Sequence, residues 1–374
     1  MKDYAFHNPV TAIMGEAALE KLGEVAAGKK VLLVYGSASA ERNGSLARVS
    51  EIVEGVGGTV VRYGGITQCT YDAIAKGTAK AREALVDMVV GLGGASAMDT
   101  AKAIAFCAVH ENHGDYLTGK LPQNSDEKLP LTLIPTYPST GSEANGVSDI
   151  MGYAGGIHGV FADYALLYPP FTYSLDARNT AYSTMVLLAQ TGYRYFTDEN
   201  PISRGFTATS LRAVLDAFDA LMANPDDCDA RATMLWASFI ETSGLLGLSM
   251  EDNWTYSIFS AAGLLRFTRG TVYRENLAMV YPRWLVWSAK HHPEAVRDFA
   301  AEVFGADPAL TPEAAVRVAY ERCMDILRAG NLPTTLEEAP SREDVDAAIP
   351  RVSSKEFAPD EYYDMIQACT KEEI

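Results

Sequence analysis

The fold is decided by Val89-Val90-Gly91-Leu92-Gly93-Gly94-Ala95-Ser96-Ala97-Met98-Asp99-Thr100-Ala101-Lys102-Ala103-Ile104. An apolar, β-branched run ends at Gly93-Gly94, and a segment with helical spacing follows at once, so the stretch predicts a buried strand that turns into a helix. Glycines let backbone N–H groups approach an anion, and a helix N-terminus favours negative charge. The stretch therefore predicts a pyrophosphate site, with a tight structural turn as the alternative interpretation.

Similar strand-like runs flank this stretch on both sides, at residues 30–35, 59–63 and 131–135. Because they alternate with helical segments, they predict a parallel sheet covered on both faces. From about residue 176 only helical periodicity remains. We therefore predict an α/β N-terminal domain with a Rossmann-like sheet over residues 1–175, an all-α C-terminal domain over 176–374, and a substrate cleft between them. The clearest predicted helices of the second domain span 207–222, 230–246 and 312–328, with loops at 225–227, 305–308 and 330–333.

Length and composition fit a soluble two-domain protein. A chain of 374 residues is long enough for two hydrophobic cores, and its net charge of −17 argues against nucleic acid or an anionic membrane as a partner. The acidic start at Met1-Lys2-Asp3 lacks the layout of a signal peptide, and no apolar run reaches the roughly 18 residues of a membrane span. We expect a cytoplasmic protein whose five widely spaced cysteines are reduced.

A second motif, Pro135-Thr136-Tyr137-Pro138-Ser139-Thr140-Gly141-Ser142-Glu143, follows another predicted strand. It places hydroxyls and a glycine at the carboxyl edge of the sheet, where α/β folds bind nucleotides. Together the two motifs resemble the signature pair of the iron-containing alcohol dehydrogenase family. Further matches to its butanol-dehydrogenase-like branch lie at 35–44, 116–120 and 277–284. The resemblance implies a dehydroquinate synthase-like fold, an NAD(P)-dependent oxidoreductase acting on a small molecule, and a homodimer.

The resemblance also implies which residues hold the cofactor. Those at the glycine-rich turn are expected on the pyrophosphate, and those of the second motif around the nicotinamide or adenosine. For Asp99 two interpretations stay open, one at the cofactor and one in fixing the helix start. The expected cofactor residues of these two motifs are Gly93, Gly94, Ala95, Ser96, Asp99, Thr136, Tyr137 and Thr140.

The choice between NAD and NADP depends on the residues after the second strand. Where NAD-preferring members carry an aspartate for the ribose 2′-OH, this chain has Gly36, flanked by Ser37, Ser39 and Arg42. Without a carboxylate at that position, hydroxyls, backbone amides and a guanidinium could accept a 2′-phosphate. We therefore predict NADP, with NAD as the alternative; Arg42 is equally well explained as a solvated surface residue.

The family binds its divalent metal through an aspartate, a histidine one helical turn later, and two further histidines. Alignment places Val186, Gln190, Ser257 and Tyr273 at these positions, the third uncertain by one or two residues. The six histidines support this, since none lies between 159 and 290. Such side chains do not supply the ligands that iron or zinc needs, so we predict no metal. The acids left as possible ligands of another site, or as solvated or paired acids, are Asp163, Asp252 and Glu275.

Without a metal, another group must stabilise or protonate the reacting oxygen. Tyr182, Tyr256 and Tyr273 are expected near the vacated site, and Arg269 or Arg274 could lower the pKa of a phenol there. Aromatic filling of an emptied cavity is the alternative interpretation for each tyrosine. A fourth candidate, His158, lies in a glycine-rich stretch where the family often has a lysine near the nucleotide; an ordinary loop histidine is its alternative.

Three hypotheses follow. The first is a metal-independent NAD(P)H oxidoreductase acting on a small carbonyl compound or an activated alkene. The second is a cofactor-binding protein without turnover, with a regulatory or assembly role. The third, a structural protein that keeps only the fold, is disfavoured because Gly93-Gly94 and Thr140-Gly141-Ser142 are intact.

Overall fold

The computed structural model describes residues 3–36, 39–121, 123, 126–151, 157–198, 200–248, 250, 257–352, 354 and 357–373. The chain forms two compact units. The sheet unit consists of His7–Ser174 and Asp226–Ser243. The helical unit consists of Met1–Phe6, Leu175–Pro225 and Gly244–Ile374.

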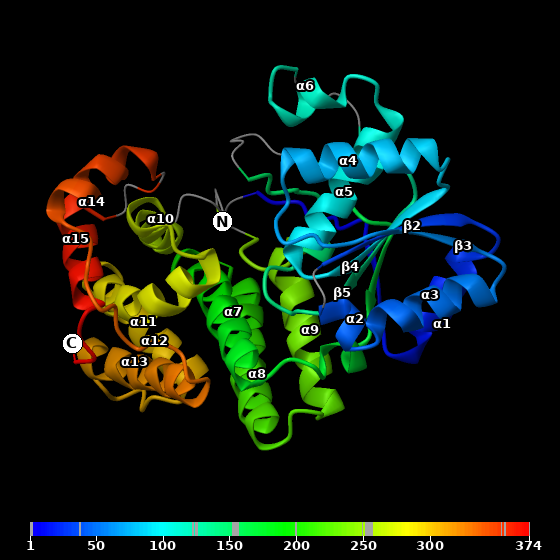
Figure 1. The fold of residues 1–374 in the computed structure, drawn as a ribbon. Coiled ribbons are helices and arrows are strands. Elements are labelled where there is room, and N and C mark those ends of the chain that lie inside the picture. Colours follow the sequence, from blue (N-terminus) through cyan, green and yellow to red (C-terminus); the bar gives the residue numbers. More distant parts are fainter. Residues whose placement is uncertain are drawn as a thin grey trace. The chain divides into compact units, whose positions relative to one another are not determined.

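The sheet unit is built on a parallel six-stranded sheet with the order β1-β6-β5-β4-β2-β3 (Figure 1). Four of its strands were predicted, whereas β1 and β6 were missed because each has only four residues. The strands are β1 (Thr11–Met14), β2 (Lys30–Tyr35), β3 (Thr59–Tyr63), β4 (Met88–Gly93), β5 (Leu131–Pro135) and β6 (Tyr164–Leu167).

Helices cover both faces of this sheet, as its apolar strands require. Successive residues of a strand point to opposite faces. Accordingly, Val31 and Leu33 of β2 pack in one core with α1 and α3, while Leu32 and Val34 pack in a second core with α4 and α5. Figure 1 shows these two helix pairs on either side of the sheet. The helices along residues 7–174 are α1 (Glu16–Ala26), α2 (Ser39–Arg42), α3 (Ser45–Gly55), α4 (Tyr71–Glu83), α5 (Ala95–Val109), α6 (His113–Leu117) and the 3₁₀ helices η1 (Ser142–Ala144) and η2 (Pro169–Thr172).

The helical unit has a core of its own, in which Trp284, Tyr281 and Phe299 are fully buried. No strand occurs among its described residues. The fold class is therefore confirmed: an α/β unit with a parallel sheet, followed by a helical unit. Its helices are α7 (Ala177–Thr197), α8 (Pro201–Ala223), α10 (Ser257–Arg269), α11 (Tyr273–His291), α12 (Pro293–Phe304), α13 (Pro312–Ala329), α14 (Arg342–Ala348), α15 (Pro359–Ala368) and the 3₁₀ helix η3 (Ile349–Arg351).

Helix α9 (Cys228–Thr242) belongs to the sheet unit, although the sequence analysis placed it in the helical half. Its residues Leu235 and Phe239 lie in the same core as α4 and α5. Helical periodicity shows that a segment has an apolar face but does not show what that face packs against. The helix is also shorter than predicted, because it ends before Gly244, which has a φ of +87°.

Gly330 follows α13 as predicted, but for a different reason than expected. Its φ of −81° is ordinary, and Asn331 takes the left-handed conformation instead, with a φ of +50°. A Cβ on Gly330 would lie 2.2 Å from the Cβ of Ala181 in α7. The glycine is therefore required by close packing between two helices.

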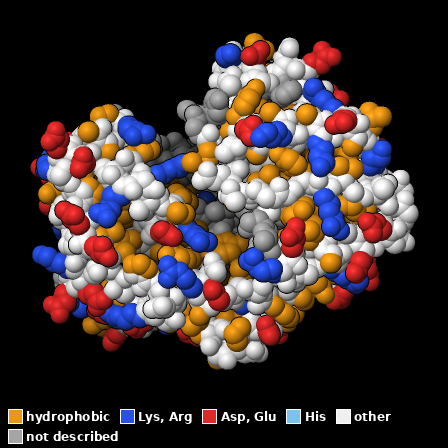
Figure 2. All heavy atoms as spheres, in the orientation of Figure 1, with side chains coloured by type: hydrophobic (Ala, Val, Ile, Leu, Met, Phe, Trp, Pro, Cys, Tyr) orange, Lys and Arg blue, Asp and Glu red, His pale blue; other side chains and the backbone are white. Residues whose placement is uncertain are grey.

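Surface and membrane properties add little further constraint. No helix in the described part of the chain is long and apolar enough to cross a bilayer. On the face drawn in Figure 2, Lys and Arg side chains are interspersed with Asp and Glu side chains.

Candidate functional site

The turn between β4 and α5 leaves the N-terminus of a 15-residue helix open. Gly93 has a φ of +147°, a conformation that favours glycine, and Gly94 precedes the helix as its N-cap without a side-chain hydrogen bond. Ala95 and Ser96 of the first turn are half-buried. Backbone N–H groups at such a position have no acceptor within the helix, so the turn can receive an anion.

The space available for a side chain differs between Gly91 and Gly94. A Cβ on Gly91 would lie 2.7 Å from Leu133 Cδ2 and 2.8 Å from the Ala101 Cβ, so close packing of α5 on the sheet requires it. A Cβ on Gly94 would meet only the Tyr137 Cβ, at an ordinary 3.7 Å, and the φ of Gly94 is −87°. Since the fold does not demand a glycine at 94, its absent side chain fits close approach by a ligand.

Three strand ends bring the predicted cofactor residues together. The backbone N–H of Thr136 donates to the carbonyl oxygen of Gly93 at 3.0 Å, which joins the ends of β5 and β4. On the other side of β4, a Cβ on Gly93 would lie 3.6 Å from the backbone nitrogen of Gly36. Thr136, Tyr137 and Thr140 are half-buried along this edge. The predicted Ser37 lies outside the described residues, as does the side chain of Ser39.

The short helix α2, which follows Gly36, contains the carboxylate of Glu41. This acid was not considered in the sequence-based prediction. Tyr35 Oη donates to Glu41 Oε1 at 3.4 Å. Arg42, the next residue, is exposed. The ribose end of the predicted site thus carries one acid and one base on the same helical turn.

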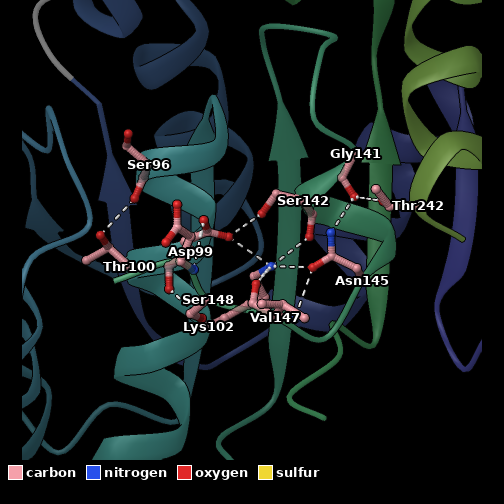
Figure 3. A network of polar contacts seen from close by, with 11 residues as sticks. Ser96, Asp99, Thr100, Lys102, Gly141, Ser142, Asn145, Val147, Ser148 and Thr242 are labelled. Atoms are coloured by element: carbon pink, nitrogen blue, oxygen red, sulfur yellow. Dashed lines mark hydrogen bonds and ion pairs between the residues drawn. The ribbon is translucent and has the colours of Figure 1, made fainter. Parts of the chain in front are cut away.

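Asp99 and Lys102 of α5 fasten this helix to the loop that follows β5, as Figure 3 shows. Both are buried, and Lys102 Nζ lies 3.0 Å from Asp99 Oδ1. Ser142 Oγ donates to the same carboxylate oxygen at 2.6 Å, and Ser148 Oγ donates to the Asp99 carbonyl at 3.0 Å. Since Asp99 does not cap α5, its observed contacts serve to join α5 to the loop.

Helix α9 holds the same loop from its other side. Ser238 Oγ accepts hydrogen bonds from the backbone N–H groups of Ser139 and Gly141, at 3.0 and 3.1 Å. Gly141 has a φ of +58°, and a Cβ there would lie 2.3 Å from the Ser238 carbonyl oxygen. Thr242 Oγ1 donates to the Gly141 carbonyl. Sequence reasoning missed Ser238 and Thr242 because they lie about a hundred residues further along the chain.

Glu143 is a buried acid next to this network. One of its carboxylate oxygens has no hydrogen-bond partner among the described residues. Burial raises the pKa of Glu143 to about 7, although the nearby Lys102 ammonium lowers it. The carboxyl group therefore titrates near neutrality.

The helical unit contains the tyrosines predicted as acids. Tyr182 is buried, with the guanidinium carbons of Arg178 and Arg274 at 5.4 and 5.1 Å from its ring centroid. Burial raises the pKa of Tyr182 because it outweighs both guanidiniums, and Glu275 raises it further. Arg269 instead donates to the Glu338 carbonyl. The predicted Tyr256 lies outside the described residues.

The positions aligned with the family's metal ligands do not form a donor set for iron or zinc. Val186 offers only a hydrocarbon side chain to the core. Gln190 Nε2 donates to Tyr273 Oη at 3.2 Å, and Ser257 Oγ accepts from Trp284 Nε1 at 2.8 Å. Divalent metals of this class are bound by three or four ligands from histidine, cysteine, aspartate or glutamate side chains, and none of the four residues is of these types. These four residues therefore do not fit the metal.

Of the other candidate ligands, Asp163 has partners elsewhere. Asp163 precedes β6, where it pairs with Lys128 at 2.8 Å and accepts from the Leu131 N–H at 2.7 Å. Asp252 lies outside the described residues. In the described part of the chain, no group of three or more His, Cys, Asp or Glu side chains could hold a metal ion.

His158 is exposed, and its loop is held through the backbone. The N–H of His158 donates to Gln123 Oε1 at 2.9 Å, and its carbonyl accepts from the same amide group. Its neighbour Ile157 pairs with Ser148 of the loop after β5. The predicted contact of His158 with phosphate or substrate stays a prediction.

The open N-terminus of α5 lies at the carboxyl edge of a parallel sheet, which is where open α/β sheets commonly bind nucleotides. Residues 9–169 match the family model of the iron-containing alcohol dehydrogenases. The chain is similar to this family, and the family model matches its N-terminal part.

Three relatives show the extent of the similarity. The chain is 27% identical over 321 residues to the probable NADH-dependent butanol dehydrogenase 1 of Bacillus subtilis, covering 83% of this chain and 82% of the relative. It is 25% identical over 302 residues to the NADPH-dependent aldehyde reductase YqhD of Escherichia coli, covering 78% and 76%. The crystal structure of NADH-dependent butanol dehydrogenase A from Thermotoga maritima superposes with a TM-score of 0.85 at 23% identity, over 99% of both chains.

These relatives place the chain among NAD(P)-dependent oxidoreductases of the alcohol and aldehyde dehydrogenase type. Some are named for NADH and others for NADPH. The comparisons therefore support this family, while the nucleotide, the substrate and the catalytic groups belong to the following proposal.

Proposed function

We propose that the protein is an NADP-dependent oxidoreductase that transfers hydride to or from a small carbonyl compound or an activated alkene without a catalytic metal. The nicotinamide cofactor supplies or accepts the hydride. The observation that carries the proposal is the open N-terminus of α5 behind Gly94, fastened to the loop after β5.

The sheet order supports one orientation of the cofactor. β4 lies between β2 and β5, so a pyrophosphate on the amides of Ala95 and Ser96 has Gly36 on one side and Thr136 to Thr140 on the other. We assign the adenosine ribose to the β2 side and the nicotinamide to the β5 side. Thr136, Tyr137 and Thr140 then border the nicotinamide half.

The preference for NADP is supported by the turn after β2. Gly36 places no carboxylate where a 2′-phosphate would lie, and Arg42 is exposed on the same short helix. The negative charge of Glu41 opposes the positive charge of Arg42, but the Glu41 carboxylate accepts a hydrogen bond from Tyr35 Oη. We propose that NADP binds more tightly and that NAD is the weaker alternative.

Tyr273 is the proposed proton donor or acceptor. It is half-buried, and the hydrogen bond from the Gln190 amide to its Oη orients the phenol. Tyr182 is less suited because its pKa is raised. We keep Tyr256 and His158 as further candidates at the substrate.

A second candidate function is nucleotide binding without turnover. It is supported by the residue types Val186, Gln190, Ser257 and Tyr273, which include neither the histidines nor the aspartate expected to hold the family's Lewis acid. This hypothesis predicts normal cofactor affinity and no carbonyl reduction.

One experiment separates the two candidates. The purified protein is titrated with NADPH and NADH by fluorescence, its metal content is determined, and a panel of aldehydes, ketones and enones is assayed with and without chelator. Chelator-resistant turnover supports the oxidoreductase, and binding without turnover supports the second candidate. Failure to bind either nucleotide contradicts both, while stoichiometric iron or zinc contradicts the metal-free mechanism.

A further inference from the structure

Lys102 carries a positive charge in the interior of the sheet unit. Its side chain is fully buried, and its ammonium has contacts in every donor direction. It donates to the Ser142 carbonyl at 2.9 Å, to Asn145 Oδ1 at 3.1 Å and to the Val147 carbonyl, and it lies 3.0 Å from Asp99 Oδ1. Three of these four partners belong to the loop after β5, as Figure 3 shows.

Asp99 completes the attachment of the same loop. Its carboxylate accepts from Ser142 Oγ at 2.6 Å and from the Asp149 N–H at 3.4 Å. The pair Asp99–Lys102 therefore contacts the loop at several points between Ser142 and Asp149. A buried ion pair of this kind is costly to desolvate unless its remaining hydrogen bonds are satisfied, and here the loop satisfies them.

The two halves of the proposed cofactor site depend on this pair to different degrees. The pyrophosphate donors, the amides of Ala95 and Ser96, belong to α5 itself and need no support from Lys102. Thr136 to Thr140 are anchored at one end by β5, and beyond Gly141 by the contacts of Lys102 and Asp99. Displacing the loop therefore affects the nicotinamide side first.

We propose that Lys102 is a positioning residue for the nicotinamide half of the cofactor, acting by holding the loop after β5 against α5. This inference rests on the proposed function. A side chain without charge at this position removes one donor from each of three loop acceptors and the positive partner of the Asp99 carboxylate. Because weakening the pairing of buried polar groups is costly, we expect the loop to shift.

The test compares nucleotides with and without a nicotinamide. Lys102→Met and the milder Ser142→Ala are titrated with NADPH and with 2′-phospho-ADP-ribose, and with NADH and ADP-ribose. We expect roughly tenfold weaker binding of the dinucleotides and a change of less than about twofold for the nicotinamide-free probes, as one lost buried hydrogen bond implies. Lys76→Met, at an exposed lysine of α4, is the matched control and leaves all four affinities unchanged.

Circular dichroism and thermal melting show which variants fold. If Lys102→Met does not fold, the nucleotide affinities of Ser142→Ala decide whether the inference holds. Equal weakening of both kinds of probe, or no weakening, overturns the inference. A wild-type protein that binds none of the four nucleotides contradicts the proposed function instead, so the two failures are distinguishable.

Discussion

The amide nitrogen of Gln190 lies 3.2 Å from the phenol oxygen of Tyr273, and the sequence pattern matches both residues to expected metal-ligand positions of the family. Gln190 Oε1 has no partner among the described residues, and Gln190 is only 8% exposed. The two side chains therefore contact each other directly through an amide–phenol hydrogen bond.

Replacing Tyr273 by phenylalanine is expected to reduce turnover by about 10²- to 10⁴-fold, because that is the usual contribution of a general acid or base. NADPH affinity should stay unchanged, since the nucleotide site belongs to the sheet unit. Steady-state kinetics and fluorescence titration measure the two effects. Tyr182→Phe is the matched control, and equal turnover of Tyr273→Phe and wild type would remove Tyr273 from the mechanism.

Gln190→Leu should lower kcat by roughly fivefold through loss of one hydrogen bond of about 1 kcal/mol to the phenol. It should leave KM for the nucleotide unchanged. A kcat equal to that of the wild type, in a variant with the wild-type melting temperature, would show that the amide does not orient Tyr273.

Gly94→Ala and Gly91→Ala are expected to separate binding from stability. At Gly94 the new methyl group has room in the fold but intrudes between the backbone and the pyrophosphate, so NADPH affinity should fall roughly tenfold with little change in melting temperature. At Gly91 it meets Ala101 and Leu133, and overpacking should destabilise the protein by about 1–3 kcal/mol. A stable Gly94→Ala variant with wild-type affinity contradicts the assignment of the anion site.

Glu143 should make stability depend on pH. Its pKa of about 7 lies above its usual 4.5, so the folded protein keeps a proton that the unfolded chain has released. The contribution of Glu143 to stability is therefore fully present below about pH 4.5 and is lost as the pH rises to about 7. At 1.36 kcal/mol per pKa unit the loss is up to about 3 kcal/mol.

Urea unfolding of wild type and Glu143→Gln at pH 5 and pH 8 tests this expectation. The glutamine does not titrate, so its stability relative to the wild type should increase between the two pH values. A constant difference would show that Glu143 does not change its proton occupancy on folding.

Native thiol labelling should modify one of the five cysteines. Cys228 is exposed, whereas burial raises the pKa of Cys69 and Cys107 to about 12 and that of Cys369 to about 11, and also raises that of Cys323. Buried thiols react slowly because they are inaccessible and protonated. An aromatic disulfide reagent should detect one thiol in the native wild type, none in Cys228→Ser, and five in the unfolded wild type.

The sequence predicted what depends on local pattern. The strands at 30–35, 59–63, 88–92 and 131–135 were found because buried parallel strands are continuous apolar runs, and Gly93 was found because it ends such a run before a helix. β1 and β6 are too short to produce a comparable signal. The contacts of Lys102 were not predicted, although the residue stands in the quoted motif, because a buried lysine has the same sequence appearance as an exposed one.

Contacts between distant segments could not be predicted either. Ser238 and Thr242 contact Gly141 only because α9 packs within the sheet unit. Nothing in the sequence of residues 226–243 indicates which unit this helix packs in. The bond between Gln190 and Tyr273 likewise joins two helices 83 positions apart. Alignment indicated that both positions were altered, but not that the new side chains contact each other.

The return of α9 to the sheet unit has a practical consequence for dissecting the protein. A fragment that stops after residue 175 contains both glycine-rich motifs yet lacks helix α9, whose Ser238 accepts a hydrogen bond from the Gly141 N–H. Joining Asp226–Ser243 to that fragment through a flexible linker would restore the hydrogen bonds between α9 and Gly141. The sheet unit is thus encoded in two separate stretches of the gene, and a single continuous fragment of the sheet unit alone cannot contain both.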